Sequence, residues 1–103
     1  MKHEKILSLD PIIHAPTRLA ILSILITVEN ANFTFLKEST GTTDGNLSTH
    51  LTKLEEPGYI TIEKQFVGKK PQTTCAITKK GRKAFETYLE QLEQIVQRQK
   101  ENL

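Results

Sequence analysis

The sequence predicts a mainly α-helical fold with a small β-hairpin, and three observations support this fold class. Residues 43–56 place leucines at spacings of four and three, which is typical of an amphipathic helix. Two segments rich in β-branched residues follow, separated by a turn that contains glycine and proline. Residues 79–100 then carry apolar side chains near heptad spacing, which predicts a long last helix.

Composition and length place the chain among ordinary soluble proteins. Its 103 residues, with 37% hydrophobic and 25% charged residues, suit one domain with a single modest core. No apolar run is long enough to span a bilayer, and the N-terminal residues do not resemble an export signal. We therefore expect a cytoplasmic protein with no membrane partner.

The N-terminal third predicts a short turn and then a buried helix. Asp10 followed by Pro11 is a typical helix start, but Pro16 interrupts the segment and suits a first-turn position itself. From Pro16 the apolar residues surround much of the helix, which we expect to end near Val28. The polar residues that follow end this helix.

A helix-turn-helix is expected next. Phe33–Phe35 could form a short strand before a helix at Thr34–Thr40. Gly41 suits the left-handed residue after a helix, and Thr43 can cap the helix that follows. A helix of about seven residues, a glycine turn and an amphipathic helix form the helix-turn-helix arrangement.

The C-terminal half predicts the hairpin and the long helix. Strands are expected at Tyr59–Ile62 and Gln72–Thr78, joined by a turn at Val67–Pro71. Thr78 can also cap the last helix. We thus expect a single domain over residues 1–103, with the helix-turn-helix and hairpin in 10–78.

The positive charge is confined to one block. Residues 1–58 have a net charge of −2, residues 59–83 of +6 and residues 84–103 of −2. A basic block is expected where one face of a protein meets a polyanion, so double-stranded DNA is the partner that we expect. A solvated basic surface without a partner explains the charge alone equally well.

The outward side chains of residues 43–56 are mostly short hydroxyl and amide groups, which can approach phosphates and base edges closely. A plain polar surface helix is the alternative, as a solubilising turn is for the lysines of the hairpin. Gly45 costs the helix up to about 1 kcal/mol, which a packing or close-approach constraint would explain. The candidate DNA-binding residues are Gly45, Asn46, Ser48, Thr49, Lys53, Lys69 and Lys70.

Other reactive side chains give no sign of catalysis or metal binding. Arg18 is expected to pair with an acid such as Glu38, or less readily with phosphate. His50 suits a capping, packing or phosphate contact, and Cys75 a buried apolar position. The sequence holds no spaced ligand cluster and no nucleophile or phosphate-loop motif, so we expect no enzyme activity, metal or cofactor.

Three strings together resemble small prokaryotic winged-helix transcriptional regulators of the MarR and ArsR type, particularly short stand-alone ones. They are RLAIL at 18–22, DGNLSTHLTKLE at 44–55 and TKKGRKAF at 78–85. The resemblance implies a homodimer, with the third helix in the major groove and the hairpin, or wing, alongside it. Pro57 departs from the usual pattern, and the paired metal ligands of ArsR sensors are missing, so metal regulation is not implied.

The sequence thus predicts a winged helix-turn-helix fold with a long C-terminal dimerisation helix. The leading hypothesis is a homodimeric, sequence-specific DNA-binding regulator whose small-molecule effector, if there is one, is unknown. A protein-interaction module without specific DNA binding is the alternative. The apolar seam of the last helix could instead pack on the chain's own first helix. The candidate dimer-interface residues are Phe85, Tyr88, Leu92 and Ile95.

Overall fold

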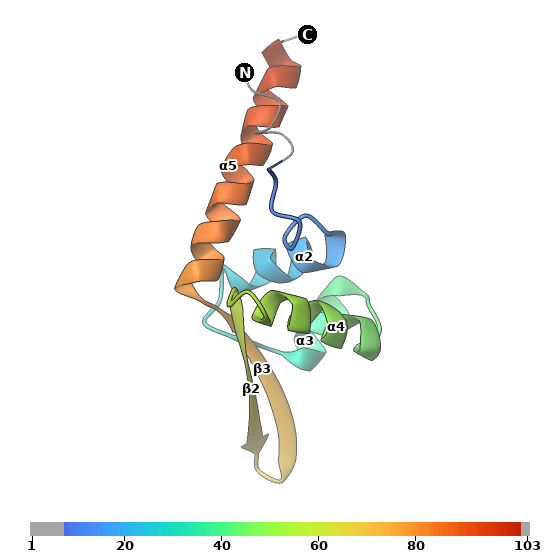
Figure 1. The fold of residues 1–103 in the computed structure, drawn as a ribbon. Helices are drawn as coiled ribbons and strands as arrows, with labels where there is room; N and C mark the ends of the chain where they lie inside the picture. The colour runs from blue at the N-terminus through green and yellow to red at the C-terminus, as the bar shows by residue number, and fades with distance from the viewer. Residues whose placement is uncertain (1–7, 102–103) are drawn as a thin grey trace.

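The computed structural model describes residues 8–101. Three short helices gather at the base of a hairpin, which projects one way while the last helix projects the other (Figure 1). The molecule is elongated, measuring 58 × 25 × 22 Å. This architecture confirms the predicted fold class. Its elements are α2 (Pro16–Leu25), β1 (Ala31–Asn32), α3 (Phe33–Thr40), α4 (Asp44–Glu55), β2 (Ile60–Val67), β3 (Lys70–Ile77) and α5 (Lys79–Glu101).

The N-terminal turn ties three parts of the molecule together. Asp10 accepts a hydrogen bond from the backbone N–H of Ile12 at 2.8 Å, which makes the expected turn before α2. Its second carboxylate oxygen accepts a hydrogen bond from the hydroxyl of Tyr59, just after α4. His14 Nδ1 lies 2.8 Å from the hydroxyl of Tyr88 on α5. The turn therefore braces α5 against the helix-turn-helix.

Two boundaries near α2 differ from expectation. The helix ends at Leu25 rather than near Val28. The reason is that the backbone N–H and the hydroxyl of Thr27 both donate hydrogen bonds to the carbonyl of Ile24, three residues back, which replaces the helical pattern. The prediction of a strand at Phe33–Phe35 was wrong. The strand that forms is β1, two residues earlier, where Ala31 pairs with Cys75 of β3. Asn32 then caps α3 through the N–H of Phe35, which starts the helix at Phe33.

The turn and caps of the helix-turn-helix are confirmed. Gly41 has φ of +68° and donates its N–H to Lys37, as expected for the residue after a helix. The hydroxyl of Thr43 accepts from the N–H of Asn46 at 3.2 Å and caps α4. These local contacts fix the angle at which α4 leaves α3.

Pro57 fits the end of α4 without disturbing it. Gly58 has φ of +84° and donates to Glu55 at 2.8 Å, while Tyr59 donates to Leu54 at 3.0 Å. These two bonds form the six-to-one and five-to-two pattern of a Schellman motif, with Pro57 between the C-cap residue Glu56 and Gly58. The proline removes one backbone donor, and the helix-ending bonds come from the residues after it.

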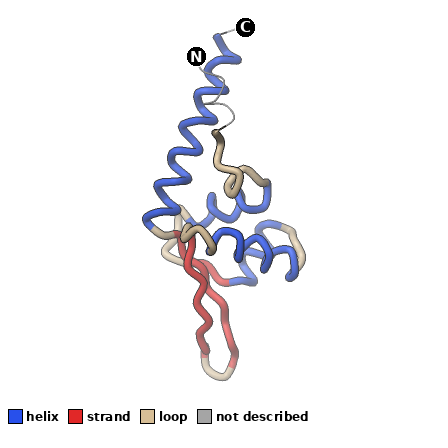
Figure 2. The backbone as a smooth tube through the Cα atoms, viewed as in Figure 1, coloured by secondary structure: helices blue, strands red, loops and turns tan. Residues whose placement is uncertain are grey.

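The hairpin is longer than expected. Strands β2 and β3 pair antiparallel from Ile60 with Ile77 to Val67 with Lys70, leaving a two-residue turn (Figure 2). Gly68 begins this turn with φ of +66°. The sequence signal stops at Ile62 because the next residues pair with the partner strand but have no core beneath them. The tip of the wing therefore lies well beyond the domain's core.

The core joins the three short helices to the hairpin base and to the first half of α5. Thr78 caps α5 by accepting from the N–H of Gly81 at 2.9 Å, as expected. Phe85 and Tyr88 are only 3% and 2% exposed within this core, so they offer no surface to a second copy. Among residues 8–101, no helix is long and apolar enough to cross a membrane.

Candidate nucleic-acid interface

Helix α4 presents a polar face to solvent. Leu47, Leu51 and Leu54 are buried against the core on one side. Ser48 faces the wing, and the other four candidate residues are open to solvent. All five are exposed, as the sequence predicted for their positions: Gly45, Asn46, Ser48, Thr49 and Lys53.

The first turn of α4 exposes hydrogen-bonding groups, and the negative charge of its carboxylate is partly neutralised. Asp44 pairs with Lys37 of α3, with 2.7 Å between Nζ and Oδ1. Because that carboxylate has a cation beside it, it repels a nearby phosphate less than an unpaired aspartate would. The Thr49 hydroxyl donates to the Gly45 carbonyl at 3.0 Å, which leaves its oxygen free to accept. Sequence reasoning missed Lys37, because its partner lies on a different helix.

Gly45 has no structural reason to be glycine within the described protomer. A Cβ built at this position meets no atom within 4 Å. A packing constraint from residues 8–101 is therefore excluded. Close approach of another molecule to the α4 backbone is the other constraint that the sequence suggested for this glycine.

Arg18 flanks α4 and holds His50, and among residues 8–101 it makes no ion pair with an acid, so its expected pairing with Glu38 was wrong. Its Nη1 lies 3.0 Å from His50 Nδ1, and its Nε donates to the carbonyl of Ile12. Because guanidinium can only donate, His50 Nδ1 must accept, which puts the ring proton on Nε2. The pKa of His50 is lowered by burial, by the charge of Arg18 and by Lys53. The neutral imidazole thus offers an N–H on the flank of α4.

A groove of about 550 Å³ separates α4 from the wing. Ser48 and Thr52 line it from α4, and Lys64 and Thr73, which are paired across the hairpin, line it from the wing. Lys64 was not among the predicted site residues. Counting by twos from Ile60 along a longer strand would have placed it on this face.

The wing tip is basic and exposed. Lys69 lies in the turn and Lys70 begins β3, so both predicted lysines are at the end farthest from the core (Figure 1). Phe66 and Val67 beside them are 76% and 60% exposed. The tip therefore combines positive charge with apolar surface. Further exposed cations lie at the start of α5: Lys79, Lys80, Arg82 and Lys83.

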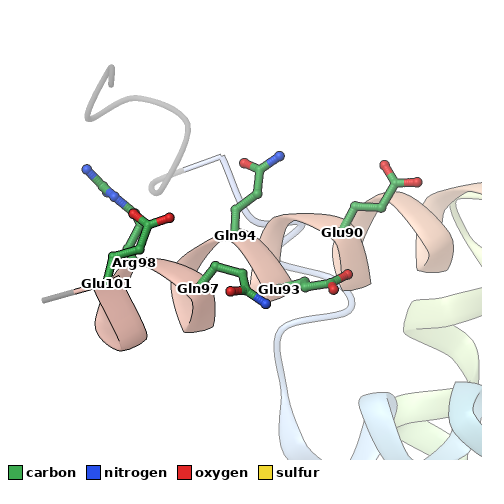
Figure 3. A pocket seen from close by; sticks show the side chains of 6 residues that line it. All are labelled: Glu90, Glu93, Gln94, Gln97, Arg98 and Glu101. Atoms are coloured by element: carbon green, nitrogen blue, oxygen red, sulfur yellow. The ribbon is translucent and has the colours of Figure 1, made fainter. Parts of the chain in front are cut away.

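The hollow near the end of α5 does not suit an anion. Its volume is about 480 Å³, and its lining is carboxylates and carboxamides with one guanidinium (Figure 3). Negative side chains along a helix repel phosphate. This hollow is far from α4 and from the wing (Figure 1). Its residues are Glu90, Glu93, Gln94, Gln97, Arg98 and Glu101.

The described residues offer little for metal or thiol chemistry. No group of three or more His, Cys, Asp or Glu among residues 8–101 is placed to hold a metal ion. Cys75 is buried as expected, and burial together with the charge of Glu55 raises the pKa of its thiol to about 11. A thiol that stays protonated is a poor nucleophile.

Known proteins resemble this chain in sequence and in fold. The protein-family model described as a winged helix DNA-binding domain matches residues 17–96. An uncharacterized protein of Methanocaldococcus jannaschii is 39% identical over 84 residues, which are 82% of this chain and 91% of that protein. A transcriptional regulator homologue from Pyrococcus horikoshii superposes with a TM-score of 0.82 at 26% identity, over 91% of this chain and 92% of its own.

The fold extends to more distant proteins. A protein of Enterococcus faecalis assigned to the MarR family of transcriptional regulators superposes with a TM-score of 0.73 at 19% identity. The superposition covers 100% of this chain and 94% of that one. The chain therefore belongs to the winged helix DNA-binding domain family, and it resembles small winged-helix transcriptional regulators in its fold.

Proposed function

We propose that the protein binds duplex DNA sequence-specifically as a homodimer, with α4 in the major groove and the wing on the adjoining backbone or minor groove. The exposed face of α4 supports this proposal most directly. Its short polar side chains surround Gly45, at which a side chain would meet nothing in the protomer. In a helix-turn-helix, this N-terminal part of the second helix approaches the base edges.

Two sets of residues divide the work of binding. The lysines of the wing tip attract the phosphate backbone and release counterions, which gives affinity without sequence preference. Asn46, Ser48 and Thr49 are short enough to reach base edges, and hydrogen bonds to bases carry the specificity. Lys53, Lys64 and the cations at the start of α5 extend the positive surface around this contact.

The second half of α5 supports the homodimer. Leu89 and Val96 are 44% and 50% exposed on a helix that projects away from the domain (Figure 1). Leu92 and Ile95 lie beside them and are half-buried. A projecting helix with such an apolar stripe is favoured to pair with the same stripe of a second copy, since a two-fold interface is self-complementary. Two copies would present two α4 helices to a palindromic site.

Selection of duplexes from a random-sequence pool tests the proposal, followed by anisotropy titrations on the best duplex. We expect two-fold symmetric sites, with affinity that falls steeply between about 50 and 200 mM salt. Absence of duplex binding at low salt by the folded protein would refute DNA binding. Recovery of unrelated sequences would refute specificity.

Paired variants separate the two roles. Lys69→Ala with Lys70→Ala should weaken binding to every duplex and flatten the salt slope by up to about two units. Removing Arg98 and Lys100 from the end of α5 deletes the same charge and serves as the control, for which we expect little change. Asn46→Ala should instead reduce the preference for the selected site over a scrambled one.

A further inference from the structure

The wing tip carries an aromatic side chain that the fold leaves unburied. Contact with the core ends at Ile62, and the next three residues of β2 are polar. Phe66 then follows with 76% of its surface exposed. Leaving a phenylalanine in water forgoes most of the gain that its burial would give. Such a side chain on a projecting arm suits a surface outside the protomer.

The strand register fixes which way Phe66 faces. Residues two apart on a strand share a face, so Phe66 lies on the same face as Ile60 and Lys64. Lys64 lines the groove beside α4, so this is the face of the wing that α4 adjoins. Directly opposite Phe66 is Pro71, and paired residues have Cβ atoms about 4.5–5.5 Å apart. Two rings therefore form one small apolar surface on the side that would meet DNA.

The surroundings of this surface favour a polyanion. Lys64 precedes it on the same face, Lys69 lies in the turn just beyond it, and Lys70 begins β3 opposite Val67. Glu63 is the one acid of the hairpin strands, and the register puts it on the other face, opposite Thr74. A ring with Lys64 on its own face and Lys69 and Lys70 at the adjoining tip thus suits a nucleic acid better than it suits a basic or neutral protein surface.

The length of the wing favours the minor groove. Phe66 lies four residues beyond Ile62, which is about 13 Å along a strand. The major groove that α4 would occupy is about 12 Å wide. An arm of this length beside α4 would be long enough to pass the bordering phosphates and reach the next minor groove. Proteins that bind there insert apolar side chains, phenylalanine and proline among them, between base steps.

We propose that Phe66, backed by Pro71, is an apolar wedge that the wing inserts into the minor groove at a flexible base step. This inference rests on the proposed DNA binding and adds a source of specificity without hydrogen bonds. Pyrimidine–purine steps unstack most readily, so the wedge should favour a TA or CA step at a fixed distance from the bases that α4 reads.

Adjacent substitutions on opposite faces of the wing test the wedge. On the selected duplex, Phe66→Ala should lower affinity about tenfold, because the apolar contact is lost. The salt slope should not change, because no phosphate contact is removed. Val67→Ala is the control, because Val67 is also exposed but lies on the other face of the wing. Shortening this side chain should change the affinity less than about twofold. Circular dichroism of each variant checks folding.

A fluorescent adenine analogue at the TA step under the wing supplies an independent readout. Its emission should rise when the wild-type protein or the Val67→Ala variant binds and unstacks it, and should stay low with Phe66→Ala. Equal affinities of Phe66→Ala and Val67→Ala would overturn the wedge while leaving DNA binding intact. A quenched, stacked probe in the wild-type complex would also overturn it. Failure of the wild type to bind any duplex would overturn both proposals.

Discussion

Two helical glycines should respond to alanine in opposite ways. Gly81, in the first turn of α5, packs directly on the backbone after α4. A Cβ there would lie 2.0 Å from the carbonyl oxygen of Tyr59 and 2.8 Å from its carbonyl carbon. Gly45, in the first turn of α4, has nothing within 4 Å of the same atom. Alanine has a higher helix propensity than glycine at both positions. The difference between the two stability changes therefore measures the cost of the packing contact at Gly81.

The contact at Gly81 determines the size of the effect. An ordinary contact would require the Tyr59 carbonyl to move by about 1.4 Å. That carbonyl already accepts from the N–H of Thr78 at 3.0 Å and from its hydroxyl at 3.1 Å. Overpacking costs about 1–3 kcal/mol and a lost cap about 1, against a propensity gain of at most about 1. We expect Gly81→Ala to destabilise the protein by about 1–3 kcal/mol.

Thermal and urea unfolding followed by circular dichroism measure both variants, at one protein concentration because dimerisation would shift the midpoint. Gly81→Ala should lower Tm by about 4–24 °C, and Gly45→Ala should raise it by up to about 4–8 °C. Gly45→Ala should nevertheless bind the selected duplex at least about tenfold more weakly, if DNA approaches this backbone closely. A Gly81→Ala protein as stable as the wild type would refute the packing argument, and unchanged DNA binding by Gly45→Ala would refute close approach.

Three other predictions concern the dimer, the histidine and the thiol. Leu89→Glu should make the protein sediment as a monomer at tens of micromolar. Gln94→Glu on the polar face of α5 is the control and should sediment as the wild type does. A wild type that sediments as a monomer would refute the dimer. Because the pKa of His50 is lowered in the fold, the unfolded chain binds more protons below about pH 6.5, so stability is present above that pH and lost as pH falls. Urea titrations at about pH 7.5 and about pH 5.5 should show that the free energy of unfolding falls less between these pH values for His50→Gln than for the wild type. An equal fall in both proteins would contradict the lowered pKa of His50. Cys75, with its pKa raised to about 11, should react with a thiol reagent at neutral pH only after unfolding, and fast labelling of the native protein would contradict its burial.

Short-range signals were read correctly because their causes lie within a few residues. Thr43 and Thr78 cap their helices through N–H groups three positions on. Gly41 ends α3 in the left-handed conformation that glycine adopts at little cost. The leucine spacing of α4 likewise predicted which face is buried, and with it the positions of the exposed polar residues.

Errors arose where a distant segment decides the outcome. The first strand forms at Ala31–Asn32 because β3 pairs with it there, and nothing in the local sequence marks that register. Arg18 bonds to His50, which is 32 residues away, rather than to Glu38. Phe85 and Tyr88 continue the apolar stripe of α5 in the sequence, yet the N-terminal turn and the core bury both within the protomer.

The sequence by itself determined the element types, the helix caps, the exposed polar face of α4 and the confinement of positive charge to the wing and the start of α5. Periodicity, capping chemistry and charge order are properties of the chain taken a few residues at a time. Only the tertiary structure decided how far the wing extends, that Phe66 and Lys64 share its α4-facing side, and that Gly81 is packed while Gly45 is free. Those features depend on pairing register and packing between distant segments, which local propensity does not encode.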